Sequence, residues 1–89
     1  MTLDKPLRQP DYRLETIDDE LLLFHPAKTQ VLYCNQSASV IWQLCDGQRT
    51  TQEIVTLLRD TYPEAANEIV EDVTATLQTF KDYDAIKFV

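Results

Sequence analysis

The chain has 89 residues, of which 44% are apolar and 26% charged, a composition typical of one globular domain with a single hydrophobic core. Its net charge of −7 at pH 7 disfavours nucleic acid as a partner, because Lys and Arg side chains supply most of the affinity for phosphates. The longest apolar run, residues 21–24, is far shorter than the roughly 20 residues that span a bilayer. Since no secretion signal opens the chain either, we expect a cytoplasmic protein without a membrane partner.

The first half of the chain has the pattern of three short strands. Residues 12–17 alternate in polarity, residues 20–25 form an apolar run, and residues 30–34 are rich in β-branched and aromatic side chains. Polar residues at 18–20 and a proline-containing turn at 26–29 separate them. Such short connections predict an antiparallel meander, which needs a second layer packed on one of its faces.

The second half has the periodicity of three helices that would cover this sheet. Their expected ranges are 36–45, 51 to about 62, and 64–81. Asn35 is a suitable N-cap for the first helix, and Gly47 is expected to end it in the left-handed conformation. Thr50 and Glu53 have the spacing of a capping box at the start of the second helix. In the third helix, apolar residues recur at helical spacing and acidic residues face solvent.

The expected element order is therefore β-β-β-α-α-α in one domain over residues 1–89, with residues 1–10 as a flexible arm and a short extended piece at 86–89. This is an α+β fold that resembles a winged helix-turn-helix. A winged-helix DNA-binding or transcription-associated domain is one function that this order allows, and its third helix would carry basic residues. Residues 53–84 instead hold eight acids and two bases, a net charge of −6. The charges thus argue against binding to nucleic acid.

No catalytic constellation is recognisable in the sequence. His25 is the only histidine and precedes Pro26 in a turn, with no serine or cysteine in the relation that a triad needs. Gly47 is the only glycine, which excludes a P-loop and a dinucleotide-binding loop. Cys34 and Cys45 lie among apolar residues, and we expect buried reduced thiols, with a disulfide as the alternative. The sequence therefore predicts no enzyme activity, no cofactor and no metal site.

Two aromatic residues are assigned to opposite environments. Trp42 is surrounded in sequence by aliphatic residues and is expected at the centre of the core, the alternative being an exposed recognition anchor. In the third strand, alternation places Leu32 and Cys34 on the face toward the helices. Val31 and Tyr33 are then expected on the other face.

Several segments together resemble one known family. Residues 39–47, with the sequence SVIWQLCDG, are similar to the "IWxLCDG" segment of PqqD-like domains, also called RiPP recognition elements. The resemblance extends over residues 20–88 and includes His25-Pro26, Thr50 with Glu53-Ile54, and Tyr62-Pro63, in this order. The chain departs from the family pattern after the third helix, where a glycine is often found and residues 82–86 have none.

The resemblance implies a non-catalytic peptide chaperone. Domains of this family bind the leader segment of a ribosomally made precursor peptide by β-strand addition, in the cleft between the third strand and the third helix. They present it to a modifying enzyme, such as a radical S-adenosylmethionine enzyme, a cyclodehydratase or a leader protease. By position, the implied peptide-binding residues of this chain are Val31, Leu32 and Tyr33 on the strand and Asp72, Thr76 and Thr79 on the helix.

These six residues differ in what we expect of them. The strand would bind the peptide through its backbone, while Asp72 would pair with a Lys or Arg of the leader. Simple solvent exposure is the alternative for Thr76 and Thr79. An exposed edge strand can also pair with a second copy of the chain, so a homodimer is a further expectation.

Overall fold

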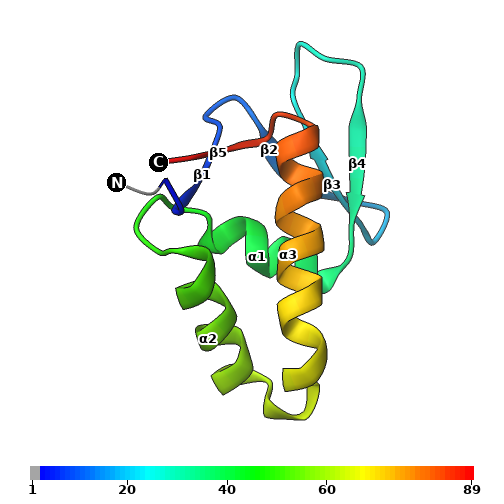
Figure 1. The fold of residues 1–89 in the computed structure, drawn as a ribbon. Coiled ribbons are helices and arrows are strands. Elements are labelled where there is room, and N and C mark those ends of the chain that lie inside the picture. The colour runs from blue at the N-terminus through cyan, green and yellow to red at the C-terminus, as the bar shows by residue number, and fades with distance from the viewer. Residues whose placement is uncertain (1–2) are drawn as a thin grey trace.

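Two antiparallel sheets and three α-helices form the fold of residues 3–89, the part of the chain that the computed structural model describes (Figure 1). The strands are β1 (Pro6–Arg8), β2 (Arg13–Ile17), β3 (Glu20–Phe24), β4 (Val31–Cys34) and β5 (Ile86–Phe88). The helices are α1 (Gln36–Leu44), α2 (Thr51–Thr61) and α3 (Ala66–Asp82), with a 3₁₀ helix, η1 (Pro63–Ala65), before α3. The predicted α+β fold, a three-stranded antiparallel sheet followed by helices, is confirmed. The finer winged-helix assignment stays a prediction.

The meander has the strand order β2-β3-β4. A two-residue turn joins β2 to β3, and both of its residues, Asp18 and Asp19, have positive φ angles of 51° and 68°. This is the type I′ geometry whose twist matches that of paired strands, and Asp is one of the residues that adopt it readily. The turn therefore determines the register, in which Ile17 pairs with Glu20.

The helix caps agree with the sequence in two places. The Asn35 Oδ1 atom accepts a hydrogen bond of 2.8 Å from the Ala38 N–H at the start of α1. At the start of α2, the Glu53 N–H donates to Thr50 Oγ1 (3.1 Å) and the Thr50 N–H donates to Glu53 Oε1 (3.0 Å). This reciprocal pair satisfies two backbone donors that the helix itself leaves free. The third helix starts later than expected, because Pro63–Ala65 forms η1.

Gly47 has the left-handed conformation that was expected, but it does not end α1. Cys45, with φ −82°, is the C-cap residue of α1, and Gly47, with φ 76°, lies two positions further on. A Cβ atom on Gly47 would stand 3.1 Å from Cδ1 of Leu7, and the Gly47 N–H donates to the Pro6 carbonyl at 2.9 Å. The lack of a side chain at Gly47 thus allows β1 to pack closely against this turn.

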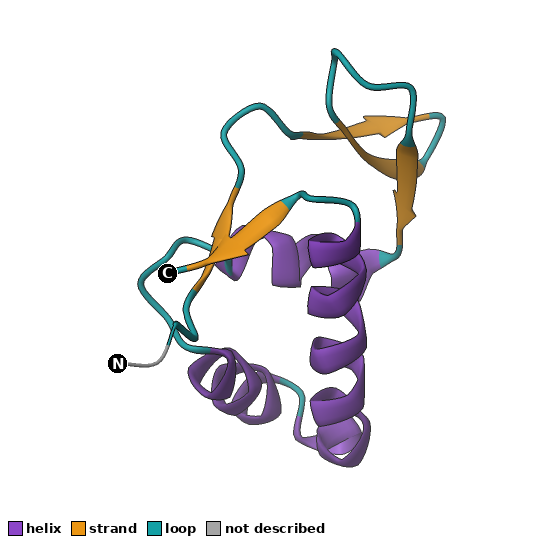
Figure 2. Cartoon of the chain, turned by 45° about the horizontal axis from the view of Figure 1, so that its top comes forward, coloured by secondary structure: helices purple, strands orange, loops and turns teal. Residues whose placement is uncertain are grey.

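The expectation of a flexible arm over residues 1–10 was wrong for Pro6–Arg8, while residues 1–2 lie outside the described part. These three residues form β1, which pairs antiparallel with β5 (Figure 2). The flanking Gln9 N–H donates to the Ala85 carbonyl at 2.8 Å. Both strands have three residues, too few to show an alternating pattern, so only their long-range pairing defines them.

The turn from α3 into β5 explains how the chain manages without a glycine there. Asp84 has φ 60° and takes the left-handed position that glycine often occupies. Asp is one of the few other residues that visit this region routinely. The Ala85 N–H then donates to the Phe80 carbonyl at 2.8 Å, which closes the end of the helix.

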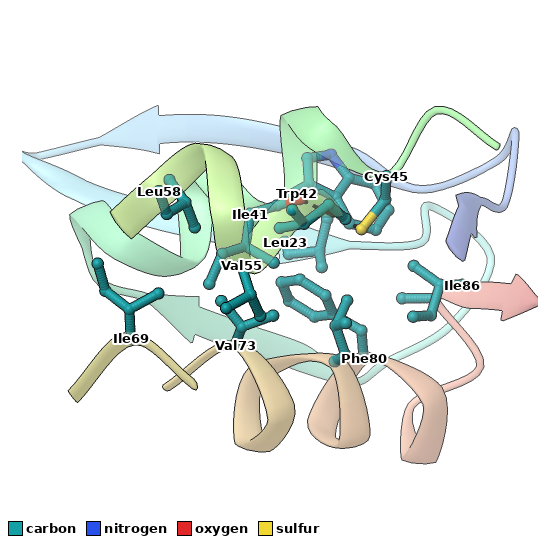
Figure 3. Close-up of a cluster of buried hydrophobic side chains, with 13 residues drawn as sticks. Leu23, Ile41, Trp42, Cys45, Val55, Leu58, Ile69, Val73, Phe80 and Ile86 are labelled. Carbon is teal, nitrogen blue, oxygen red and sulfur yellow. Dashed lines mark hydrogen bonds between the residues drawn. The ribbon is translucent and has the colours of Figure 1, made fainter. Parts of the chain in front are cut away.

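The core lies among α1, α2 and α3, with Leu23 of β3 and Ile86 of β5 packed against them. Trp42 from α1, Leu23 from β3 and Phe80 from α3 point toward one another in it (Figure 3). The Trp42 and Phe80 rings meet edge to face, with centroids 5.4 Å apart. Trp42 is only 5% exposed, so its assignment to the core is confirmed.

Candidate functional site

One edge of the meander, the outer edge of β4, has no partner strand among residues 3–89. The turn between β2 and β3 shows which backbone groups this edge offers. Ile17 and Glu20 close the two-residue turn as a hydrogen-bonded pair. Because the hydrogen-bonding direction alternates along a strand, Leu21 and Leu23 of β3 direct their N–H and C=O groups toward β4.

The register of β3 with β4 shows which backbone groups of β4 are left free. Leu21 pairs with Cys34 and Leu23 pairs with Leu32, so these two residues of β4 use their backbone groups within the sheet. Val31 and Tyr33 therefore direct their N–H and C=O groups to the free edge. An extended peptide that approaches this edge finds two residues with unused donors and acceptors.

The side chains of β4 divide as the sequence predicted. Leu32 and Cys34 are half-buried and pack against the core, whereas Val31 is 44% exposed and Tyr33 70% exposed. Tyr33 is among the most exposed large apolar side chains of residues 3–89. At Tyr33 the side chain is therefore exposed, and the backbone N–H and C=O groups face the free edge of β4.

The predicted helix residues lie along one side of α3. Asp72, Thr76 and Thr79 are about one turn apart, next to the buried stripe that contains Val73 and Phe80. Asp72 is exposed and the two threonines are half-buried. The Thr79 Oγ1 atom donates to the Ala75 carbonyl at 3.0 Å. Figures 1 and 2 both place β4 on the side of α3 that is away from β1 and β5.

Two cavities lie beside the first turn of α1. The first has a volume of about 210 Å³, lies between α1, α2 and α3, and includes Asp72 in its lining. The second is an open depression of about 520 Å³ at the end of β4 and includes Tyr33. Gln36 lines both cavities, whereas Thr76 and Thr79 line neither. Sequence reasoning missed Gln36, because a polar residue in the first turn of a helix gives no signal of its own.

The acidic side of α3 is not neutralised within the described residues. The ion pairs of residues 3–89 are His25–Asp11, Lys28–Asp84 and Arg49–Asp46, and none of them includes an acid of α3. A ligand with a positive charge would therefore meet an unpaired carboxylate beside the first cavity.

Comparison with known proteins assigns the chain to a family. The model of the PqqD family, described as coenzyme PQQ synthesis protein D, matches residues 20–86. The chain belongs to the PqqD family. The match confirms the resemblance inferred from the segment at 39–47, and it runs from the first residue of β3 to the first residue of β5. No curated protein and no solved structure matched the chain.

Membership of the PqqD family supports a role in a peptide-modification pathway as an accessory, non-catalytic domain. Residues 3–89 contain no helix that is both long and apolar enough to cross a membrane. Within the same residues, no three potential metal ligands of the His, Cys, Asp or Glu type come together.

The two thiols of this PqqD-family chain are free, and burial makes them poor nucleophiles. Burial raises the pKa of Cys45 from its ordinary value of 9.0 to about 12, and burial also raises the pKa of Cys34. We expect iodoacetamide to modify Cys45 far more slowly than Cys34 in the native protein at about pH 8, since only the thiolate reacts. Mass spectrometry of a time course checks this, and equal rates in the native protein would contradict it. Unfolding in urea should equalise the rates.

The raised pKa of Cys45 also predicts how stability depends on pH. The native state holds the thiol proton more tightly than the unfolded state. The contribution of this thiol to the free energy of unfolding is therefore complete below about pH 9. It is lost as the pH rises from about 9 toward 12, where the native thiol also ionises.

Proposed function

We propose that this domain binds the leader segment of a ribosomally made precursor peptide and presents it to a modifying enzyme. The leader adds as a strand to the free edge of β4, with Val31, Leu32 and Tyr33 on one side and Asp72, Thr76 and Thr79 on the other. The unused backbone groups of Val31 and Tyr33 are the observation that carries this proposal. Backbone hydrogen bonds give such a complex affinity for any extended peptide, and neighbouring side chains select its sequence.

The proposed partners follow from the family and from the charges. A leader with Lys or Arg residues suits the acidic α3, and a radical S-adenosylmethionine enzyme, a cyclodehydratase or a leader protease would receive the bound peptide. In this role the domain works in the cytoplasm without a cofactor of its own. The acidic helix also disfavours the alternative of DNA binding, because phosphates would be repelled.

A titration of the ¹⁵N-labelled chain tests the proposal. Leader peptides encoded beside its gene are added, and amide shifts are followed by NMR. We expect the shifts to concentrate in Val31–Cys34 and in residues 68–80, with little change for a scrambled peptide of the same composition. Shifts spread evenly over the surface, or equal responses to the scrambled peptide, would reject strand addition.

A further inference from the structure

The cavity between the three helices has the construction of a side-chain pocket. Its floor is apolar and consists of buried Ile41, Leu58, Ile69 and Val73, with half-buried Val40 and Ala65 beside them. Its rim is polar and exposed and consists of Gln36, Ser37, Tyr62, Glu64 and Asp72. An apolar cavity of about 150 Å³ can hold benzene. A cavity of about 210 Å³ therefore has room for a leucine or phenylalanine side chain.

The charges on the rim indicate which kind of peptide residue would lie next to that apolar side chain. Glu64 and Asp72 place two carboxylates at the mouth, and no Lys or Arg belongs to the lining. Neither carboxylate has an ion pair within residues 3–89. Tyr62 is 44% exposed and adds an aromatic ring, which can attract a cation to its face.

The position of the cavity connects it to the peptide-binding edge. Gln36 follows β4 by two residues and lines the cavity as well as the depression that contains Tyr33. A peptide strand that runs along β4 and continues past Cys34 reaches the cavity mouth within a few residues, at about 3.3 Å per residue.

We propose that this cavity is a specificity pocket, which takes one large apolar side chain of the bound peptide flanked by a Lys or Arg. The inference rests on the proposed leader-binding function and adds to it the kind of sequence that is selected. The apolar side chain fills the floor, while the cation lies between Glu64, Asp72 and the Tyr62 ring.

The pocket can be tested without the leader. The probe is the capped tetrapeptide acetyl-Ala-Leu-Lys-Ala-amide, added at millimolar concentration to the ¹⁵N-labelled chain. We expect shifts at Val40, Ile69 and Val73, and at least fivefold weaker binding when serine replaces the leucine or glutamate replaces the lysine of the probe. Absence of shifts at these residues, or equal binding of the three peptides, overturns the proposal.

Variants of the chain give matched controls. Ala65→Leu places a larger side chain in the cavity and should weaken probe binding at least tenfold, whereas Ala75→Leu, on the exposed side of α3, should leave it unchanged. Asp72→Asn should weaken the preference for lysine over glutamate, because Glu64 is then the one carboxylate left at the mouth, whereas Glu71→Gln, with the same change in net charge, should leave the preference unchanged. Circular dichroism verifies that each variant is folded. Equal effects of a variant and its control overturn the pocket.

The same measurements separate this inference from the proposed function. If a leader shifts Val31–Cys34 but no peptide shifts the cavity residues, strand addition stands and the pocket is rejected. If the tetrapeptide shifts the cavity and no leader affects β4, the pocket is supported and strand addition is rejected.

Discussion

Replacement of Trp42 with alanine is expected to lower the free energy of unfolding by about 3–5 kcal/mol. The indole is 5% exposed and meets the Phe80 ring at 5.4 Å and the Tyr12 ring at 6.4 Å. The variant loses the burial of a large aromatic surface, and the rigid helices around it cannot close the space completely. Since native proteins have a total stability of about 5–15 kcal/mol, this loss is a large fraction of the stability of the domain.

Urea denaturation followed by circular dichroism measures this loss. Trp42→Phe keeps part of the buried ring and should cost clearly less than Trp42→Ala. Leu57→Ala is the control, because Leu57 is 39% exposed on α2 and should cost less than about 1 kcal/mol. A Trp42→Ala variant that is as stable as the Leu57→Ala variant would show that the indole does not hold the core together.

Elements that depend on local signals were predictable from the sequence. The Asn35 cap and the Thr50–Glu53 capping box need only residues within one turn of the helix, and both are present. The burial of Leu32 against the exposure of Tyr33 follows from the two-residue period of a strand in the same direct way.

Pairings between distant segments were not predictable. The short extended piece expected at 86–89 agrees with β5, but β1 at the other end of the sequence, and the pairing of Pro6 with Phe88, have no signal in the local sequence. Gly47 carried a strong local signal for a helix end, yet its conformation serves the approach of Leu7, about forty residues earlier in the chain. A local rule can thus identify the correct residue and still assign it the wrong role.

The candidate site shows the same division. The strand residues and the acidic side of α3 came from the family resemblance and the charge pattern. The cavity did not, because its floor brings together Ile41 from α1, Leu58 from α2 and Ile69 from α3. Each of these looks like an ordinary core position in its own helix, and only the packing of three helices leaves a space between them.

Replacement of Tyr33 with proline is expected to weaken leader binding at least tenfold. The Tyr33 N–H points to the free edge of β4, so proline removes a hydrogen-bond donor that the added strand would use. A hydrogen bond contributes about 0.5–1.5 kcal/mol, and the proline ring also obstructs the approaching backbone. Proline is tolerated at such positions, because an edge strand does not need the outward N–H for its own sheet. The domain should therefore stay folded while its binding edge is blocked.

Calorimetric titration of the variants with a cognate leader provides the test. Tyr33→Ala is the matched control, since it removes the same side chain but keeps the N–H, and it should bind more tightly than Tyr33→Pro. Leu32→Pro should behave differently from both, because the Leu32 N–H lies inside the meander and its loss should destabilise the fold. Equal affinities of Tyr33→Pro and Tyr33→Ala would mean that the side chain, not the backbone edge, recognises the leader. If two copies pair through β4, Tyr33→Pro should also convert the dimer to a monomer in size-exclusion chromatography, because the same N–H would serve both contacts.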